Sequence, residues 1–93
     1  MIVRVLGGEG QYRLDDVAFA AVSEIDDRVQ AAAEAGDEAA FSAALSELVD
    51  AIHTKGEPLP IDELIGSDAV VPADGTSLAE AEALLSTDGL IPN

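Results

Sequence analysis

DDVAFAAVSEIDDRVQAAAEAGDEAAFSAALSELVDAIHTKG, residues Asp15 to Gly56, is the stretch that decides the fold. Apolar residues recur in both of its halves at the three-to-four spacing of an amphipathic helix. Gly36 is the strongest break between the halves, and Asp37 follows it at once as an N-cap. Because so short a connection leaves no room for a detour, the sequence predicts two antiparallel helices folded back on each other.

The first predicted helix starts at Asp15 or Asp16, whose carboxylates suit the positive end of the helix dipole. Glu24 and Arg28 stand four residues apart and are therefore able to pair along the helix. Phe19 lies at the edge of the apolar stripe, so it either packs on the rest of the chain or contacts a partner. The apolar face consists of Ala18, Ala21, Val22, Ile25, Val29, Ala32 and Ala33.

The second predicted helix ends at Gly56 and has an apolar stripe of its own. His53 is the single histidine and projects off that stripe in the last turn. With Lys55 it suits the negative end of the helix, so we expect an electrostatic role rather than catalysis. The stripe consists of Phe41, Ala44, Leu45, Leu48, Val49 and Ile52.

Residues 1–14 predict a β-hairpin before the helices. Ile2 to Leu6 is β-branched and apolar, the glycine-rich residues 7–10 suit a turn, and the arm that ends at Leu14 resumes the alternation. Arg4 and Arg13 would lie on opposite arms. An exposed edge at Ile2 to Leu6 would allow a second copy to pair with it, which would give a homodimer.

Residues 57–93 form an acidic segment with weaker signals. Ala69–Val71 suits a third strand, and Ser77 with Glu80 makes a capping box that opens a short helix through about Ser86. Leu90 and Ile91 are expected to pack back onto the core. The predicted fold class is therefore α+β in one domain, 1–93, with a β-hairpin over 1–14, a helical hairpin over 15–56 and the acidic segment over 57–93.

The net charge of −15, from 19 acidic residues against four Lys and Arg, restricts the partners. Nucleic acid and anionic membrane surfaces are disfavoured because both are bound through Lys and Arg. A basic protein surface, a high-salt cytoplasm, or simple solvation would each explain the charge. The chain has no cysteine, and its apolar runs are too short for a membrane span. Met1 leads into a strand pattern without an apolar leader, so we expect a cytoplasmic protein.

No catalytic arrangement emerges from the sequence. Adjacent carboxylates such as Asp26 and Asp27 point about 100° apart on a helix, and no nucleophile, metal or phosphate motif occurs. We therefore expect no catalytic residue, no cofactor and no metal, and a protein that is not an enzyme. The candidate functional residues are partner-binding ones, two aromatic and four acidic: Tyr12, Phe19, Glu24, Asp27, Glu47 and Asp50.

Four stretches, spread nearly from end to end, resemble the PspA-associated (PspAA) family. They are Met-Ile-Val-Arg-Val-Leu-Gly-Gly-Glu-Gly-Gln-Tyr-Arg-Leu (1–14), Gly-Asp-Glu (36–38) with Phe41, Gly-Glu-Pro-Leu-Pro (56–60) and Asp-Gly-Leu-Ile-Pro (88–92). The family consists of small acidic proteins encoded beside phage-shock protein A. The resemblance implies a non-enzymatic accessory of the PspA membrane-stress system, with PspA, a coiled-coil protein, as its partner.

Two functions of different classes follow. The first is a regulatory binding module for PspA or a related envelope-stress protein, which the resemblance favours. The second is an acidic decoy or antitoxin-like protein that masks the basic surface of a nucleic-acid-binding partner, which the charge favours. A neighbouring gene for a long coiled coil would support the first, and one for a small basic toxin the second.

Overall fold

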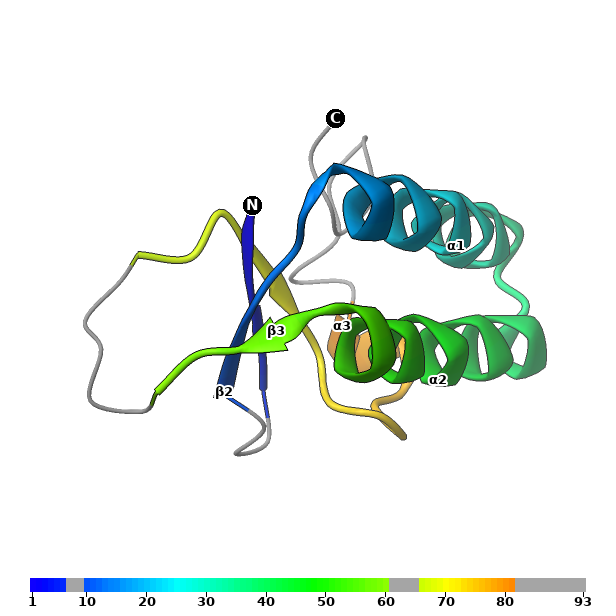
Figure 1. Cartoon of the computed structure of the whole chain (residues 1–93). Coiled ribbons are helices and arrows are strands. Elements are labelled where there is room, and N and C mark those ends of the chain that lie inside the picture. The colour runs from blue at the N-terminus through cyan, green and yellow to red at the C-terminus, as the bar shows by residue number, and fades with distance from the viewer. Residues whose placement is uncertain (7–9, 61–65, 82–93) are drawn as a thin grey trace.

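The computed structural model describes residues 1–6, 10–60 and 66–81 of the chain. Two long helices, α1 (Asp16–Ala35) and α2 (Glu38–Lys55), lie side by side and project from one side of a small sheet (Figure 1). The strands are β1 (Ile2–Val5), β2 (Gly10–Arg13), β3 (Glu57–Pro58) and β4 (Ala69–Val71), and a short helix, α3 (Leu78–Ala81), follows them. The predicted α+β class is confirmed.

The helical hairpin forms as its caps predict. The Asp15 carboxylate accepts a hydrogen bond of 2.8 Å from the Ala18 N–H, so Asp15 rather than Asp16 is the N-cap of α1. Gly36 ends α1 with φ of 69°, the left-handed conformation that glycine adopts most easily. The Asp37 carboxylate then accepts from the Ala40 N–H at 3.1 Å and starts α2. The break between the helices is therefore where the sequence predicts it.

The strands form one sheet in the order β3-β2-β1-β4. β1 pairs antiparallel with β2, as a hairpin should, and it pairs parallel with β4 on its other side. The expectation of an exposed edge at Ile2 to Leu6 is wrong, because β2 and β4 occupy both sides of β1. A second copy cannot pair with that strand without displacing one of them.

β4 is joined to β1 through Asp68, the residue before the strand. Its N–H donates to the carbonyl of Ile2 at 2.7 Å, and its carboxylate accepts from the Ile2 N–H at 2.8 Å. At the other end, the Leu6 N–H donates to the carbonyl of Val71 at 2.9 Å. The third strand predicted at Ala69–Val71 is thus confirmed, and the parallel pairing brings this late segment of the chain back beside β1.

Alternation along β1 decides which face of the sheet meets the helices. Val3 and Val5 are buried and Arg4 between them is exposed. The two valines join the apolar faces of the helices in one core, to which β4 adds its two buried residues. The largest fully buried apolar side chains are Phe41, Leu45, Leu48, Ile52, Val3, Val5, Val22, Val29 and Val71.

The core also contains a carboxylate that the sequence did not predict. Asp26 of α1 is only 2% exposed, beside the buried Ile25. Its neighbour Asp27 is exposed, as the helical pattern predicts. Burial of a charged group requires compensating polar interactions, so Asp26 is a structural feature of α1 rather than part of its acidic surface.

The predicted cap at Ser77 opens α3, although Glu80 reaches back to the hydroxyl of Ser77 and not to its backbone N–H. The Glu80 N–H donates to the Ser77 hydroxyl at 3.2 Å, and that hydroxyl donates to the Glu80 carboxylate at 3.0 Å. Glu38, the first residue of α2, accepts a 2.8 Å hydrogen bond from the Leu78 N–H and ties α3 to the hairpin. The extension of this helix to about Ser86 and the packing of Leu90 and Ile91 lie outside the described residues.

Candidate partner-binding surface

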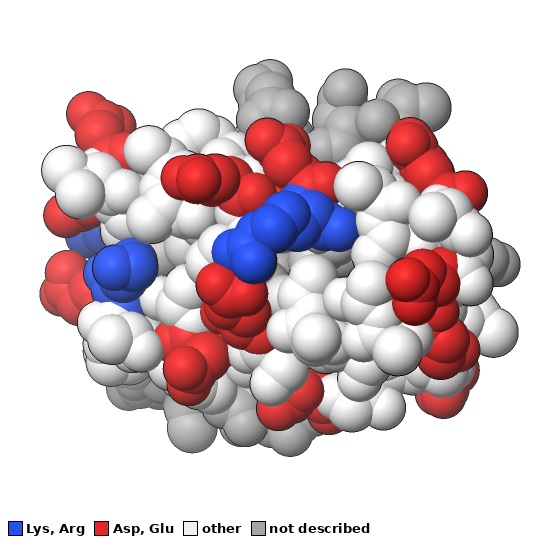
Figure 2. Space-filling model, turned by 90° about the vertical axis from the view of Figure 1, so that its right-hand side faces the viewer, with Lys and Arg blue, Asp and Glu red and all other residues white. Residues whose placement is uncertain are grey.

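Acidic side chains cover the outer surface of the helical hairpin. Glu24 and Asp27 of α1 are exposed and lie one turn apart, and Glu47 and Asp50 repeat this spacing on α2. Figure 2 shows acidic groups spread over one face of the molecule with few basic groups among them. All four predicted acidic candidates are therefore accessible to a partner.

A bidentate ion pair crosses between the helices within this surface. The two terminal nitrogens of Arg28 donate to the two carboxylate oxygens of Glu47 at 2.9 and 2.8 Å. Arg28 does not take up the pairing with Glu24 that the spacing allows: it reaches across to α2 instead, and Glu24 acts on it only through its charge. The pair links the surfaces of α1 and α2, whereas a pair within one helix would not connect them.

This ion pair changes the charge available at the surface. The hydrogen bond from Arg28 holds the pKa of the Glu47 carboxyl below its usual range, against a smaller opposing effect of desolvation. The hydrogen bond and charge of Glu47, helped by the charge of Glu24, raise the pKa of the Arg28 guanidinium. Glu47 thus stays ionised, but its charge is already matched. Glu24, Asp27 and Asp50 make no ion pair with any described residue.

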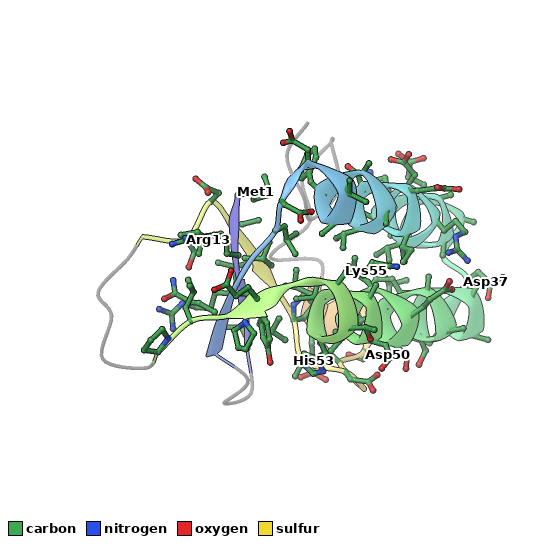
Figure 3. All side chains as sticks on the ribbon, viewed as in Figure 1. Met1, Arg13, Asp37, Asp50, His53 and Lys55 are labelled. Atoms are coloured by element: carbon green, nitrogen blue, oxygen red, sulfur yellow. The ribbon has the colours of Figure 1, made fainter. Side chains whose placement is uncertain are left out.

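Tyr12 is half-buried and packs against the core. Its ring lies 5.2 Å from the ring of His53, centroid to centroid, at an angle of 42°. His53 projects from the last turn of α2, as Figure 3 shows, so this contact joins β2 to the end of that helix. The partner contact predicted at Tyr12 therefore competes with a role in packing. No local pattern predicts that Tyr12 lies beside His53, because the two residues are 41 positions apart.

The other aromatic candidate is also half-buried. Phe19 packs against the core, which is the first of the two roles that the sequence left open. Sequence reasoning overlooked Val17, which is 81% exposed in the first turn of α1. The sequence contains the signal, because Val17 is an apolar residue of the first turn that falls outside the apolar stripe. An exposed valine beside acidic groups offers an apolar contact that Phe19 offers only in part.

The described residues form no enclosed site. They contain no pocket and no group of three or more metal-ligating side chains. Within them no helix is long and apolar enough to cross a membrane. What the described part of the chain offers a ligand is a convex, charged surface, which suits contact with a macromolecule more than capture of a small molecule.

Comparison with known proteins gives one clear relationship. Searches of curated proteins and of solved structures found no match. The family model for the PspA-associated protein matches residues 1–93, the full length of the sequence. The chain belongs to the PspA-associated protein (PspAA) family.

Proposed function

We propose that this protein is a non-enzymatic accessory of the PspA membrane-stress response, which regulates PspA by direct contact in the cytoplasm. The observation that carries the proposal is the family match over residues 1–93, since the family is described by its association with PspA. The acidic outer surface of the hairpin supports a protein partner over nucleic acid, because phosphate groups would be repelled.

The contact surface in this proposal is the outer side of α1 and α2. Glu24, Asp27 and Asp50 supply the attraction, since Glu47 is matched by Arg28. Charge alone gives steering more than affinity, so an apolar contact is also required. Val17 is the most exposed apolar candidate, ahead of the half-buried Phe19.

The test is binding to purified PspA across a salt series. Exposed charges are screened beyond about 8 Å at physiological ionic strength, so the association rate should fall as salt rises. Asp27→Asn with Asp50→Asn should slow association more than Glu57→Gln with Asp68→Asn, a control pair that removes the same charge from the region of the sheet instead of the two helices. Val17→Ala should raise the dissociation rate instead.

Each part of the proposal can fail separately. Absence of binding to PspA at low salt would contradict the function. If the two double substitutions slow association equally, the proposed location of the contact surface is contradicted, because net charge alone would then explain the attraction. DNA and anionic vesicles serve as negative controls. Tight binding to either would contradict both the proposed function and the proposed contact surface.

The net charge of −15 supports one alternative, an acidic decoy that masks a basic surface. A decoy would bind a small basic nucleic-acid-binding protein and release its nucleic acid. Pull-down with the tagged protein from its own host, followed by identification of the captured protein, separates the two functions: PspA supports the first and a basic nucleic-acid-binding protein the second.

A further inference from the structure

The sheet has a second face, turned away from the helices. Alternation along the strands places Ile2, Arg4, Gln11, Arg13 and Val70 on this face, opposite the buried valines of β1. Figure 1 shows both long helices on the other side of the sheet. We call these five residues the outer sheet face.

Both basic residues of the outer sheet face are accessible. Arg4 and Arg13 are exposed, and Figure 3 shows Arg13 on the side of the sheet away from the helices. They are two of only four Lys and Arg in the whole sequence. A protein with this excess of acid nevertheless gathers half of its strong bases on one small surface, which sets that surface apart from the rest.

Neither arginine side chain is neutralised by the described part of the chain, where the one ion pair joins Arg28 to Glu47. Glu57 is the register partner of Arg13 on β3, but no ion pair connects them. The carboxylate of Asp68 accepts a hydrogen bond from the Ile2 N–H instead. Arg28, by contrast, is fully engaged with Glu47. Within the described residues, the guanidinium groups of Arg4 and Arg13 are thus exposed and form no ion pair, as the binding of carboxylates from another molecule requires.

The geometry suits a pair of carboxylates. Arg4 is the register partner of Gln11 and Arg13 of Ile2, so the arginines are diagonal neighbours, with Cα atoms about 7–8 Å apart. Carboxylates four residues apart on a helix are separated by about 6 Å along its axis. The two spacings differ by only about 1–2 Å, which long arginine side chains can span. Each guanidinium can then bind one carboxylate through two hydrogen bonds.

The same face offers apolar contacts beside the charges. Ile2 and Val70 are half-buried, and each keeps part of its surface open. Among the described residues of the connection before β4, the Ser67 hydroxyl accepts a 2.7 Å hydrogen bond from Gln11, and Asp68 is hydrogen-bonded to the backbone of Ile2. Arg4 and Arg13 remain exposed beside these contacts. A helix laid on this side would add a third layer to the fold.

We propose that the outer sheet face binds an acidic amphipathic helix of another protein, with Arg4 and Arg13 on two of its carboxylates and Ile2 and Val70 against its apolar stripe. Nucleic acid and anionic bilayers fit less well, because two arginines in a chain of net charge −15 cannot offset repulsion from a polyanion. This surface is separate from the acidic side of the hairpin, and the inference does not depend on the proposed PspA contact.

The experiment is a titration of the isotope-labelled full chain, followed by backbone amide and arginine side-chain NMR signals. The probe is a synthetic amphipathic helical peptide with glutamate pairs four residues apart. Signals from residues 2–4, 11–13 and 70 should shift, with those of α1 and α2 unchanged. The same peptide with every Glu replaced by Gln should bind at least about tenfold more weakly.

Variants of matched charge complete the test. Arg4→Gln with Arg13→Gln should lower the affinity for the acidic peptide at least about tenfold, while Lys55→Gln with Arg28→Gln should leave it nearly unchanged. Preserved amide dispersion in each variant shows that it is folded. The proposal is overturned if the acidic peptide produces no shifts, if its shifts fall on the helices, if both variant pairs lose equal affinity, or if a DNA oligonucleotide shifts the same face more strongly.

Discussion

Gly56 stands where the end of α2 approaches the sheet. A Cβ atom built on it would lie 2.6 Å from the carbonyl oxygen of Ile52, and 3.1 Å from both the Leu14 Cδ2 and the Tyr12 Cβ. Its φ of −83° is open to any residue, so space and not backbone conformation requires glycine here. The sequence predicts that a helix ends at Gly56, but the close approach to β2 depends on tertiary packing and could not be read from it.

Gly56→Ala should destabilise the protein by about 1–3 kcal/mol, because the added methyl group would lie too close to the Ile52 carbonyl oxygen and tightly against Leu14 and Tyr12, so the end of α2 must shift. The free energy of unfolding is measured by chemical denaturation. Gly66→Ala is the control, since a Cβ there meets nothing within 4 Å. Equal stabilities of the two variants would show that α2 and β2 separate at little cost.

Position 36 requires glycine because of its backbone conformation and not because of space. Its φ of +69° is unfavourable for a side chain, although a Cβ would have open space around it. Gly36→Val should cost about 1–2 kcal/mol through backbone strain, and Gly36→Asn should cost less because asparagine tolerates this conformation. A thermal melt of Gly36→Val that matches the parent would contradict the assigned end of α1.

At the scale of elements, local patterns predicted the hairpin helices and the capping box, whose contacts join residues close in the sequence. They failed where partners come from different elements. Spacing along one helix favoured Glu24 as the partner of Arg28, but the relative position of α1 and α2, which spacing does not contain, brings Glu47 closer. The two-residue β3 was missed for the same reason: Pro58 argues against a strand, and pairing with Tyr12 creates one.

The ion pair between the helices makes a pH-dependent contribution to stability. Because the pKa of Glu47 is lower in the folded state, the contribution is fully present above the usual value of 4.5 and disappears as the pH falls through the folded value. Glu47→Gln should therefore lose stability relative to the parent at neutral pH, and the two should converge in acid. The measurement is the free energy of unfolding as a function of pH.

Glu24→Gln is the control for that series, because Glu24 makes no direct bond to Arg28 among the described residues. Glu24→Gln should still lose the stability contributed by the Arg28–Glu47 pair as the pH falls, whereas Glu47→Gln has no such contribution to lose. A constant difference between Glu47→Gln and the parent at every pH would mean that the substitution acts through packing and not through ionisation.

At the scale of the whole molecule, the net charge of −15 is spread over a body 37 Å long. The Debye length is about 30 Å at 0.01 M ionic strength and about 8 Å at 0.15 M, so at low salt each carboxylate is repelled by others across most of the molecule. Composition predicted this charge, but the placement of Arg4 and Arg13 on one face needed the strand register.

Added salt should therefore raise the free energy of unfolding, because screening weakens a repulsion that is stronger in the compact state than in the unfolded chain. The denaturation midpoint in urea, an uncharged denaturant, is measured at low and physiological ionic strength. Sodium chloride and potassium chloride should act alike if screening is the cause. A midpoint that falls with salt would mean that attractive ion pairs outweigh the repulsion.

The strand order has a consequence for synthesis on the ribosome. β1 emerges first and occupies the interior of the sheet, but its partner β4 begins at Ala69. The hairpin of α1 and α2 can form from neighbouring residues while the chain is still being made, whereas one side of β1 waits for nearly the whole sequence. Until then one edge of β1, whose other edge is paired with β2, lacks its partner. A pause in translation before Ala69 would therefore leave an apolar strand edge open, and such edges favour aggregation.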